Sequence, residues 1–506
     1  MTLKGSRHVT DHQTNEVIIL GAGLAGLGAG YALSRSNSSS KSGIDLLVIE
    51  AGNTVGGLAR TINHHGFKFD LGGHRFKTSN KKTEQLIRQI MKDELLVVGR
   101  SSKILLRNKY FDYPLQPLNA LSGFGLPTVS RIIFDYAVEQ MRWRFNHRFK
   151  KAPMVSLEDW VVRNFGRTLF DIYFKEYSEK VWGIDCNRIC MEWMEQRIQK
   201  LSLGKAIHRA LFKYKGSNHT QYSMSEERTL ASEFLYPAQG IGRIAERLGE
   251  EIEKNSRVLT DSRIVRISHH ADKIESVTTR TGPVDGQAGS ETCTHKGNEF
   301  ISSIPVATLV QLLEPRPPTD VLEAASKLKY RDLVIVTIML ERERVTDQTW
   351  IYFPEQKIPF ARIHEPTNWS DKMAPTGKTL LVTEHFCFRG DETWSASDEE
   401  LAQRTISHLV KLGFIKDHEV IDKLILRIPR AYPLFEVGYT EHHKKICDYL
   451  DRYRNLRLIG RGGMFRYYNM DHAIESGITA AEAIMADRSE TIKEEREALS
   501  PTGSDL

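Results

Sequence analysis

The sequence predicts a mixed α/β protein organised around a dinucleotide-binding Rossmann unit, with an inserted helical region and an antiparallel sheet region. Three observations lead to this fold class. Residues 16–33 read as an apolar strand, a glycine turn and a small-residue helix; the pattern is helical from about 118 to 211; and strand-like segments return between 257 and 429. With 506 residues, the chain is too long for one simple core, so several structural units are expected.

The N-terminal unit begins with the apolar run EVIIL, which starts at Glu16 and predicts a buried strand. A second apolar run, IDLLVIE, ends at Glu50 and completes the strand, helix, strand order of a parallel sheet. The turn after the first strand reads GAGLAG and contains Gly21, Gly23 and Gly26. Such glycines permit a tight turn and bring a pyrophosphate close to a helix N-terminus, while Glu50 can accept a hydrogen bond from a ribose hydroxyl. The alternative is a glycine-rich packing turn without a ligand.

The rest of the chain divides into segments that alternate between these regions. Spaced aromatic and charged residues predict the helical insertion, and runs such as LVIVTIML and KTLLVTEHF predict the sheet. The run LRLIG, a glycine turn and a helix around HAIESGITAAEAIM return to the Rossmann unit. The predicted parts are a flexible N-terminus (1–15), a discontinuous dinucleotide-binding domain (16–80, 233–317 and 455–487), an antiparallel sheet and substrate domain (81–116 and 318–454), a helical substrate domain (117–232) and a flexible tail (488–506).

Composition narrows the classes of function. The formal net charge is +6, and Lys and Arg are scattered along the chain, so we expect anionic small ligands and no nucleic acid. The five cysteines have no CxxC spacing, which argues against a disulfide framework or a zinc site and favours a reducing compartment. No signal peptide and no apolar run of about 20 residues is found, so we expect a cytoplasmic protein without an integral membrane span. Association into a homo-oligomer is left open.

Histidine pairs and a basic segment are interpreted as structural. The pairs are His64 with His65, His269 with His270, and His442 with His443; adjacent strand residues point to opposite faces, and no Cys or acid lies at a familiar ligand spacing. We therefore predict no metal. The segment RWRFNHRFKK is interpreted as a solvated helix face, with binding to an anionic membrane surface as the alternative.

The segment AGNTVGGLART follows Glu50 and resembles the second fingerprint of the amine-oxidase-like flavoproteins. The resemblance implies that Gly57 lies against the phosphates of FAD, and Arg60 can offer a guanidinium fork to phosphate. It also implies the glutathione-reductase-like arrangement, in which the Rossmann unit is assembled from early, middle and late segments. The dinucleotide-binding domain is then an FAD-binding domain.

Further motifs resemble the UDP-galactopyranose mutase family, particularly its eukaryotic type, in consistent order along nearly the whole chain. They are FDLGGHRF, RSSKILLRNKYFDYPLQ, FKEYSEKVWGIDCNRICMEWMEQRI, YPAQGIGR, IYFPEQKIPFAR, AYPLFEVGY and GRGGMFRYYNMDHAIESG. For the flavin the matching positions are Gly73, His74, Gly240, Arg461 and Asp471. For a uridine-binding hairpin they are Arg100, Ser102, Tyr113 and Gln116, and for the sugar and diphosphate they are Trp182, Arg197, Tyr352, Arg362, Tyr432 and Tyr467.

The resemblance implies a flavin-dependent mutase that interconverts UDP-galactopyranose and UDP-galactofuranose for surface polysaccharide or glycoconjugate synthesis. In that chemistry N5 of the reduced flavin is a covalent catalyst that attacks the anomeric carbon and expels UDP. Arg197 and Arg362, with the tyrosines, would hold the diphosphate charge that grows as UDP leaves. His74 would orient the reduced ring or accept its proton. NADPH is a candidate reductant.

The chain departs from the family pattern at some positions, and other interpretations stay open. Arg75 replaces an aliphatic residue, Ser178 an asparagine, and residues 202–232 do not align, so the sugar is not fixed. His74 can be a satisfied strand-end histidine, Arg197 and Arg362 can be surface residues, the latter paired with Glu365, and the tyrosines can be core aromatics. The rival function is an oxidase or desaturase of the protoporphyrinogen-oxidase kind, and a third class is a flavin-binding scaffold without turnover.

Overall fold

The computed structural model describes residues 8–37, 44–113, 125–149, 154–191, 233–282 and 291–499. Its larger sheet has the order β13-β10-β11-β12-β1-β2-β9, and β19 also pairs with β12. The parallel strands are β1 (His8–Leu20), β2 (Leu46–Ile49), β9 (Arg257–Leu259), β12 (Thr292–Ser302) and β19 (Leu456–Leu458). Early, middle and late segments therefore build one Rossmann sheet, as the sequence predicted.

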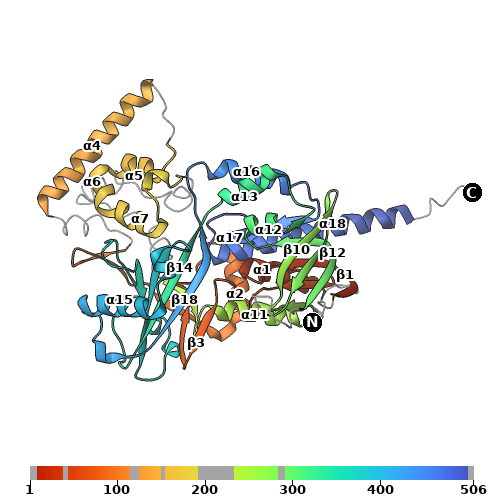
Figure 1. Ribbon diagram of the computed structural model, residues 1–506, viewed down its shortest axis with the longest axis horizontal. Coiled ribbons are helices and arrows are strands. Elements are labelled where there is room, and N and C mark those ends of the chain that lie inside the picture. Colours follow the sequence, from red (N-terminus) through yellow and green to blue (C-terminus); the bar gives the residue numbers. More distant parts are fainter. Residues whose placement is uncertain are drawn as a thin grey trace, which may run out of the picture.

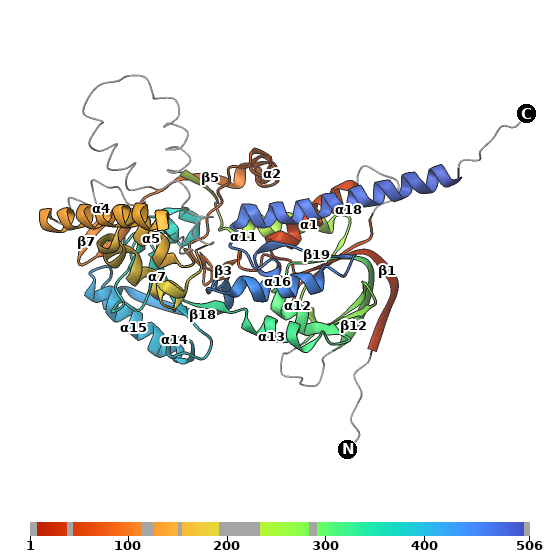
Figure 2. The same ribbon diagram turned by 90° about the horizontal axis from the view of Figure 1, so that it is seen from above.

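Helices cover both faces of this sheet (Figures 1 and 2). On one face α1 (Leu24–Asn37) packs against α11 (Gly242–Glu253) and α18 (Met470–Leu499). Beyond β12 the sheet continues as an antiparallel meander of β11 (Lys273–Arg280) and β10 (Arg263–His270), which ends at β13 (Leu313–Glu314). The helices α12 (Val306–Leu312), α13 (Thr319–Lys327) and α16 (Tyr439–Leu450) pack in sequence on the side of this meander.

The second sheet has seven strands, in the order β18-β14-β17-β16-β15-β6-β7. Its long antiparallel strands are β14 (Tyr330–Leu340), β17 (Thr379–Cys387) and, at the edge, β18 (Val420–Pro433); the residues of β14 and β17 are buried almost throughout. The shorter strands are β6 (Ser102–Leu106), β7 (Lys109–Asp112), β15 (Trp350–Tyr352) and β16 (Arg362–His364). The helix α15 (Asp398–Lys411) covers one face (Figure 1).

The helical insertion stands at the end of the molecule opposite the tip of α18 (Figures 1 and 2). It contains α4 (Leu126–Phe149), α5 (Leu157–Phe165), α6 (Arg167–Leu169), a π-helical turn η2 (Phe170–Lys175), α7 (Glu176–Trp182) and the 3₁₀ turn η3 (Cys186–Arg188). Ser156 and Asp159 form a capping box that fixes the start of α5. Within the described residues, no helix combines the length and apolar content that a membrane span requires.

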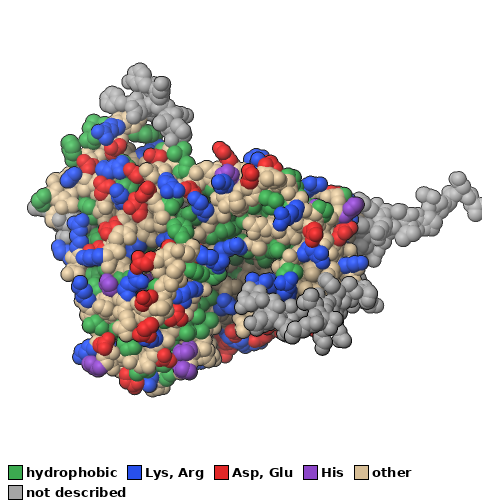
Figure 3. Space-filling model, viewed as in Figure 1, with side chains coloured by type: hydrophobic (Ala, Val, Ile, Leu, Met, Phe, Trp, Pro, Cys, Tyr) green, Lys and Arg blue, Asp and Glu red, His purple; other side chains and the backbone are tan. Residues whose placement is uncertain are grey.

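Short elements connect these regions. Two small hairpin-like sheets pair β3 (Thr61–His64) with β4 (Phe67–Asp70), and β5 (Leu95–Gly99) with β8 (Glu233–Pro237). The remaining elements are α2 (Lys81–Met91), η1 (Lys92–Glu94), η4 (Pro366–Asn368), η5 (Asp371–Met373), α14 (Glu392–Ser395), η6 (Asp417–Glu419) and α17 (Gly460–Gly463). Acidic and basic side chains are interspersed over the face shown in Figure 3.

Both ends of the chain differ from the sequence prediction. The predicted loose N-terminus overlaps β1, which begins at His8 and pairs in parallel with β12 from Thr292 onward. This pairing uses backbone groups, so it leaves little apolar signal in the sequence. The predicted loose tail overlaps α18, which continues to Leu499. Its last residues are rich in Glu, Lys, Arg and Ala, which are strong helix formers even without a buried face.

Candidate active site

The turn between β1 and α1 forms a cradle of backbone. Gly21 has φ +96°, and a Cβ on Gly26 would lie 1.9 Å from the carbonyl oxygen of Gly21. Only glycine can therefore occupy position 26 without moving the strand from the helix. A Cβ on Gly23 would meet nothing within 4 Å, so this position is open to an approaching ligand. The structure thus supplies the backbone geometry that the GAGLAG motif predicted.

Glu50 and the second glycine segment complete this cradle. The Glu50 carboxylate accepts hydrogen bonds from the backbone N–H of Ala22 and of Gly52, each at 2.8 Å, which hold it beside the turn. Gly56 forms a β-bridge with Gly23, and Arg60 Nε donates to the carbonyl of Gly57 at 2.9 Å. The segment that carries Gly57 and Arg60 therefore lies beside the first glycine turn, and a contact of these residues with FAD phosphates stays a prediction.

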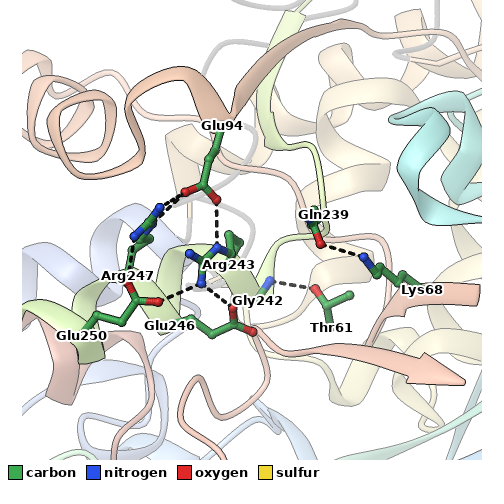
Figure 4. Close-up of polar contacts among 9 residues, drawn as sticks. All are labelled: Thr61, Lys68, Glu94, Gln239, Gly242, Arg243, Glu246, Arg247 and Glu250. Atoms are coloured by element: carbon green, nitrogen blue, oxygen red, sulfur yellow. Dashed lines mark hydrogen bonds and ion pairs between the residues drawn. The ribbon is translucent and has the colours of Figure 1, made fainter. Parts of the chain in front are cut away.

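A polar network fixes the later segment around Gly240 against the β3–β4 hairpin. A Cβ on Gly240 would lie 2.3 Å from Thr61 Oγ1, and that hydroxyl accepts the N–H of Gly242 at 2.8 Å. Figure 4 shows the adjoining ion-pair network, in which Glu94 lies between Arg243 and Arg247 of α11. Because Glu94 belongs to η1, these contacts tie η1 to the first turns of α11, and Glu250 of the same helix accepts from both arginines.

Asp70 is a buried acid behind this segment. Its carboxylate accepts from Thr61 Oγ1 at 2.6 Å, from Tyr236 Oη at 2.6 Å and from the Ile241 N–H at 3.1 Å. Burial raises the pKa of Asp70 to about 7, although all three hydrogen bonds lower it. The sequence does not mark Asp70 as a site residue, because a single acid at a strand end carries no signal without its tertiary partners.

His74 follows Gly72 and Gly73 and lies beside two guanidiniums. Its Nδ1 is buried and has no hydrogen-bond partner. Burial, together with the charges of Arg461 and Arg362, lowers the pKa of His74 to about 3. The imidazole is therefore neutral at physiological pH. Because Nδ1 has no hydrogen-bond partner, the alternative of a strand-end histidine with all its hydrogen bonds made does not hold for this atom.

Arg362 pairs with Glu384, an acid that the sequence analysis did not single out. Arg362 Nη2 makes a short hydrogen bond and ion pair with Glu384 Oε2, where the side chains are 20% and 1% exposed. Glu384 Oε1 also accepts the N–H of Gly73 at 3.1 Å, which ties the second sheet to the histidine segment. The alternative interpretation, a surface arginine paired with Glu365, does not hold, because Arg362 pairs with Glu384. Glu365 is buried and accepts backbone N–H groups from Val345 and Thr346.

A first group of aromatic rings lies near this ion pair. The Tyr352 ring lies 4.5 Å from that of Tyr113 and 5.8 Å from that of Tyr177 on α7. The guanidinium of Arg100 lies over Tyr113 and Trp350, at 5.0 and 5.6 Å from the ring centroids. Arg100 Nε also donates to Ser102 Oγ at 3.4 Å, and Arg100 Nη2 is buried without a partner.

A second aromatic group surrounds Arg461 on the other side of Arg362. The rings of Tyr432 and Tyr467 are stacked at 6.0 Å, and the Arg461 guanidinium lies over both, at 5.1 and 5.3 Å. Arg461 donates from Nε and Nη2 to the carbonyl of Tyr468, which holds it in place. Trp182 of α7 contacts Tyr467 with a centroid distance of 6.4 Å. Sequence analysis assigned Arg461 to the cofactor alone, whereas it also reaches these tyrosines.

The structure thus brings together most of the predicted site residues. They come from β6 and the segment after β7, from α7, β15, β16 and β18, and from the loop before α18. Asp471 lies in the first turn of α18, where it is buried; its Oδ1 has no hydrogen-bond partner and lies 3.6 Å from Nδ1 of the neighbouring His472. Arg197 and Gln116 lie outside the described residues. Tyr177, Glu384 and Asp70 were missed, since each acts through neighbours that are distant in sequence.

The structure also corrects the interpretation of one histidine pair. His64 and His65 were expected on opposite faces of a strand, without a nearby acid. His64 instead ends β3 and His65 begins the turn to β4, and their ring centroids lie 4.1 Å apart. Asp422 of β18 lies within 3.0 Å of both rings. The reason for excluding a metal at these histidines therefore does not hold.

Comparisons with known proteins agree with this architecture. Residues 24–485 match the family model of the flavin containing amine oxidoreductases. The coproporphyrinogen III oxidase of Bacillus subtilis (strain 168) is 19% identical over 459 residues, which cover 86% of this chain and 90% of that protein. The chloroplastic protoporphyrinogen oxidase 1 of Arabidopsis thaliana is 22% identical over 456 residues, with coverages of 85% and 80%.

Solved structures share the fold at low sequence identity. A reduced UDP-galactopyranose mutase aligns with a TM-score of 0.74 and 21% identity, covering 94% of this chain and 96% of that one. A putrescine oxidase aligns with a TM-score of 0.58 and 14% identity, covering 95% and 100%. The glutathione-reductase-like flavin-binding fold predicted from the sequence is confirmed.

FAD is the cofactor of the chain, and its residues fit this group. The open backbone at Gly23 and the carboxylate of Glu50 suit a pyrophosphate and a ribose. The buried atoms His74 Nδ1 and Asp471 Oδ1 have no hydrogen-bond partner within the chain, so a bound ligand can satisfy them. Gly21, Gly23, Gly26, Glu50, Gly57 and Arg60 would hold the dinucleotide portion, with Gly73, His74, Gly240, Arg461 and Asp471 beside the flavin ring.

Proposed function

We propose that the chain, which belongs to the flavin containing amine oxidoreductase family, is an FAD-dependent nucleotide-sugar mutase. The substrate is a UDP-linked sugar, with galactose as the first candidate, and the reaction exchanges its pyranose and furanose rings. The product contains the same atoms as the substrate, so no net oxidation occurs. NADPH is proposed as the reductant that keeps the flavin competent, and the cytoplasm as the place where precursors of surface polysaccharide or glycoconjugates are isomerised.

The observation that carries this proposal is the pair of guanidiniums, Arg362 and Arg461, among tyrosines. The charge of Arg362 acts to lower the pKa of Tyr352 and of Tyr432, against the burial that raises both. The Arg461 guanidinium lies over the Tyr432 ring. Phenol hydroxyls and arginine N–H groups are the donors that a diphosphate requires. An oxidase for apolar or amine substrates does not need two cations at this place. Arg75 and Arg100, both over the Trp350 ring, add positive charge on the nucleotide side.

The residues have distinct tasks in the proposed reaction. When bound in its reduced form, FAD supplies an electron-rich ring nitrogen for the anomeric carbon. The bond from that carbon to the diphosphate oxygen breaks, and Arg362 with Tyr352 and Tyr432 would stabilise the charge that the oxygen gains. Neutral His74 can accept a proton at Nδ1 or donate one from its other nitrogen. Glu384 would hold Arg362 in position, because it contacts both the guanidinium and the Gly73 N–H.

The names of the sequence relatives favour a second candidate, oxidation of a porphyrinogen. Such a substrate carries carboxylates, which arginines also bind. The two candidates differ in whether a nucleotide is recognised. Stacking rings at Tyr113 and Tyr352 suit a base, and this is the feature that the decisive experiment addresses.

UDP and UDP-galactose are titrated into the purified yellow protein, oxidised and dithionite-reduced, and products are separated by chromatography. We expect UDP binding in both states and a furanose product only after reduction. Arg362→Ala should weaken UDP binding by about 100-fold, which corresponds to roughly 2–3 kcal/mol for lost hydrogen bonds to a charged group. Arg344→Ala, at an exposed position outside the site, is the control and should bind as the wild type does.

If UDP does not bind and the protein consumes oxygen with a porphyrinogen, the mutase function is rejected and the oxidase function is supported. UDP binding without a furanose product would retain a nucleotide-sugar site and reject galactose, and other UDP-sugars would then be compared. Neither binding nor oxygen consumption would favour the flavin-binding scaffold.

A further inference from the structure

We propose that His64, His65 and Asp422 form a Zn²⁺-binding site, which links the β3–β4 hairpin to β18, the edge strand of the second sheet. The cluster is outside the candidate active site, and the proposed mutase reaction does not use it. Two imidazole nitrogens and one carboxylate oxygen are a common ligand set for zinc in proteins.

The turn geometry brings the two imidazoles together. His64 pairs with Phe67 across the hairpin, so the loop consists of only His65 and Gly66. Both loop residues have positive φ, +51° and +85°, as a type I′ turn requires. His65 leaves the strand in this left-handed conformation, and its side chain no longer points away from that of His64. The two ring centroids lie 4.1 Å apart with an interplanar angle of 37°.

An irregularity in β18 brings the third ligand to the hairpin. Met339 is opposite Asp422, but the next residue of β14, Leu340, is opposite Val420, so Ile421 is an extra residue on this strand. Such bulges re-aim neighbouring side chains. Asp422 Oδ1 accepts the N–H of Lys423 at 2.8 Å, which orients the carboxylate and leaves Oδ2 toward the histidines.

The ligand atoms converge at a distance that suits one ion. His64 Nε2 lies 2.9 Å and His65 Nδ1 3.0 Å from Asp422 Oδ2, and all three atoms lie within 4.8 Å of one another. Tetrahedral zinc with bonds of about 2.0–2.1 Å places its ligand atoms about 3.3 Å apart. A small outward shift therefore makes room for the ion. The His65 side chain is 76% exposed, so an ion can enter from solvent and keep a water as a fourth ligand.

The cluster is satisfied without an ion, because Asp422 Oδ2 lies within hydrogen-bond distance of both imidazoles. Zinc must therefore compete with two histidine–aspartate contacts, and moderate affinity is expected.

The test is zinc binding to the untagged, FAD-loaded protein, measured by equilibrium dialysis with metal analysis and by calorimetry with ZnCl₂. We expect one Zn²⁺ per chain and a higher melting temperature with zinc. His64→Ala and Asp422→Asn should each lower the affinity by about tenfold or more. His270→Ala removes an exposed histidine at the end of β10 and is the matched control, which should bind as the wild type does.

Zinc binding that persists at wild-type strength in Asp422→Asn, or that is absent in the wild type, overturns the proposal. Flavin content and circular dichroism show whether each variant is folded. If a variant does not fold, Co²⁺ bound to the wild type decides the question. Intense d–d absorption at longer wavelengths than the flavin bands supports a tetrahedral site, and its absence overturns one.

Discussion

The dinucleotide cradle and the candidate substrate region are built on different principles. The cradle consists mainly of backbone: its geometry follows from Gly21 and Gly26 within one turn and from Gly56 and Gly57 in the next loop. The substrate region consists of side chains from segments far apart in the sequence. Glu384 contacts both Arg362 and the Gly73 N–H of the histidine segment, and Arg461 lies over Tyr432. A short motif can therefore specify the first region, whereas the second exists only after several elements have packed together.

The largest effect is expected from Gly26→Ala, which breaks the backbone cradle. The added methyl group would lie 1.9 Å from the Gly21 carbonyl oxygen and would force α1 away from β1. We expect loss of bound FAD and much of the soluble folded protein, measured by flavin absorbance per chain and by size-exclusion chromatography. Gly99→Ala adds the same group where nothing lies within 4 Å and should retain full flavin. Equal flavin retention in both variants would show that the turn tolerates a side chain.

Glu384→Gln tests the side-chain region in the same way. It leaves the buried Arg362 guanidinium without its counter-charge, and breaking a buried pair by removal of one partner costs about 3–5 kcal/mol. We expect this loss in denaturant unfolding, with weaker UDP binding but intact flavin in the folded fraction. Glu341→Gln, at an exposed ion pair with Lys378, is the control and should cost less than about 1 kcal/mol. Loss of flavin before loss of UDP affinity would mean that the two regions are not separable.

Asp70, buried behind the Gly240 segment, predicts a pH dependence of stability. Its pKa is raised to about 7 in the folded chain, so the folded state holds a proton that the unfolded state releases near pH 4. The unfolding free energy should therefore fall as pH rises from about 4 to 7, by roughly 2–4 kcal/mol. Asp70→Asn should flatten this slope, and Asp93→Asn, at an exposed position, should not. Denaturant titrations at pH 5 and pH 8 measure the unfolding free energy of each variant. If Asp70→Asn shows the same pH dependence as the wild type, that dependence comes from other groups.

The smallest effect is expected from Tyr432→Phe, which removes one hydroxyl from the proposed diphosphate contacts and keeps the stacking on Tyr467. UDP affinity should fall by about fivefold, or roughly 1 kcal/mol for one hydrogen bond. Tyr110→Phe, on an exposed ring, should change nothing. Calorimetry with UDP measures both variants. An unchanged affinity in Tyr432→Phe would assign this ring to packing alone.

The sequence by itself determined the flavin-binding fold class with its Rossmann unit, and the cofactor. These features depend on local constraints: glycines that allow one backbone path, an acid at a strand end, and apolar runs of strand or helix period. Only the tertiary structure decided which charges meet. Arg362 pairs with Glu384 and not with Glu365, His74 lies beside two arginines, and Asp422 reaches His64 and His65 across 357 residues or more of chain. The physical reason is that such contacts depend on strand register, turn conformation and burial, which a residue acquires only from neighbours that the fold brings to it.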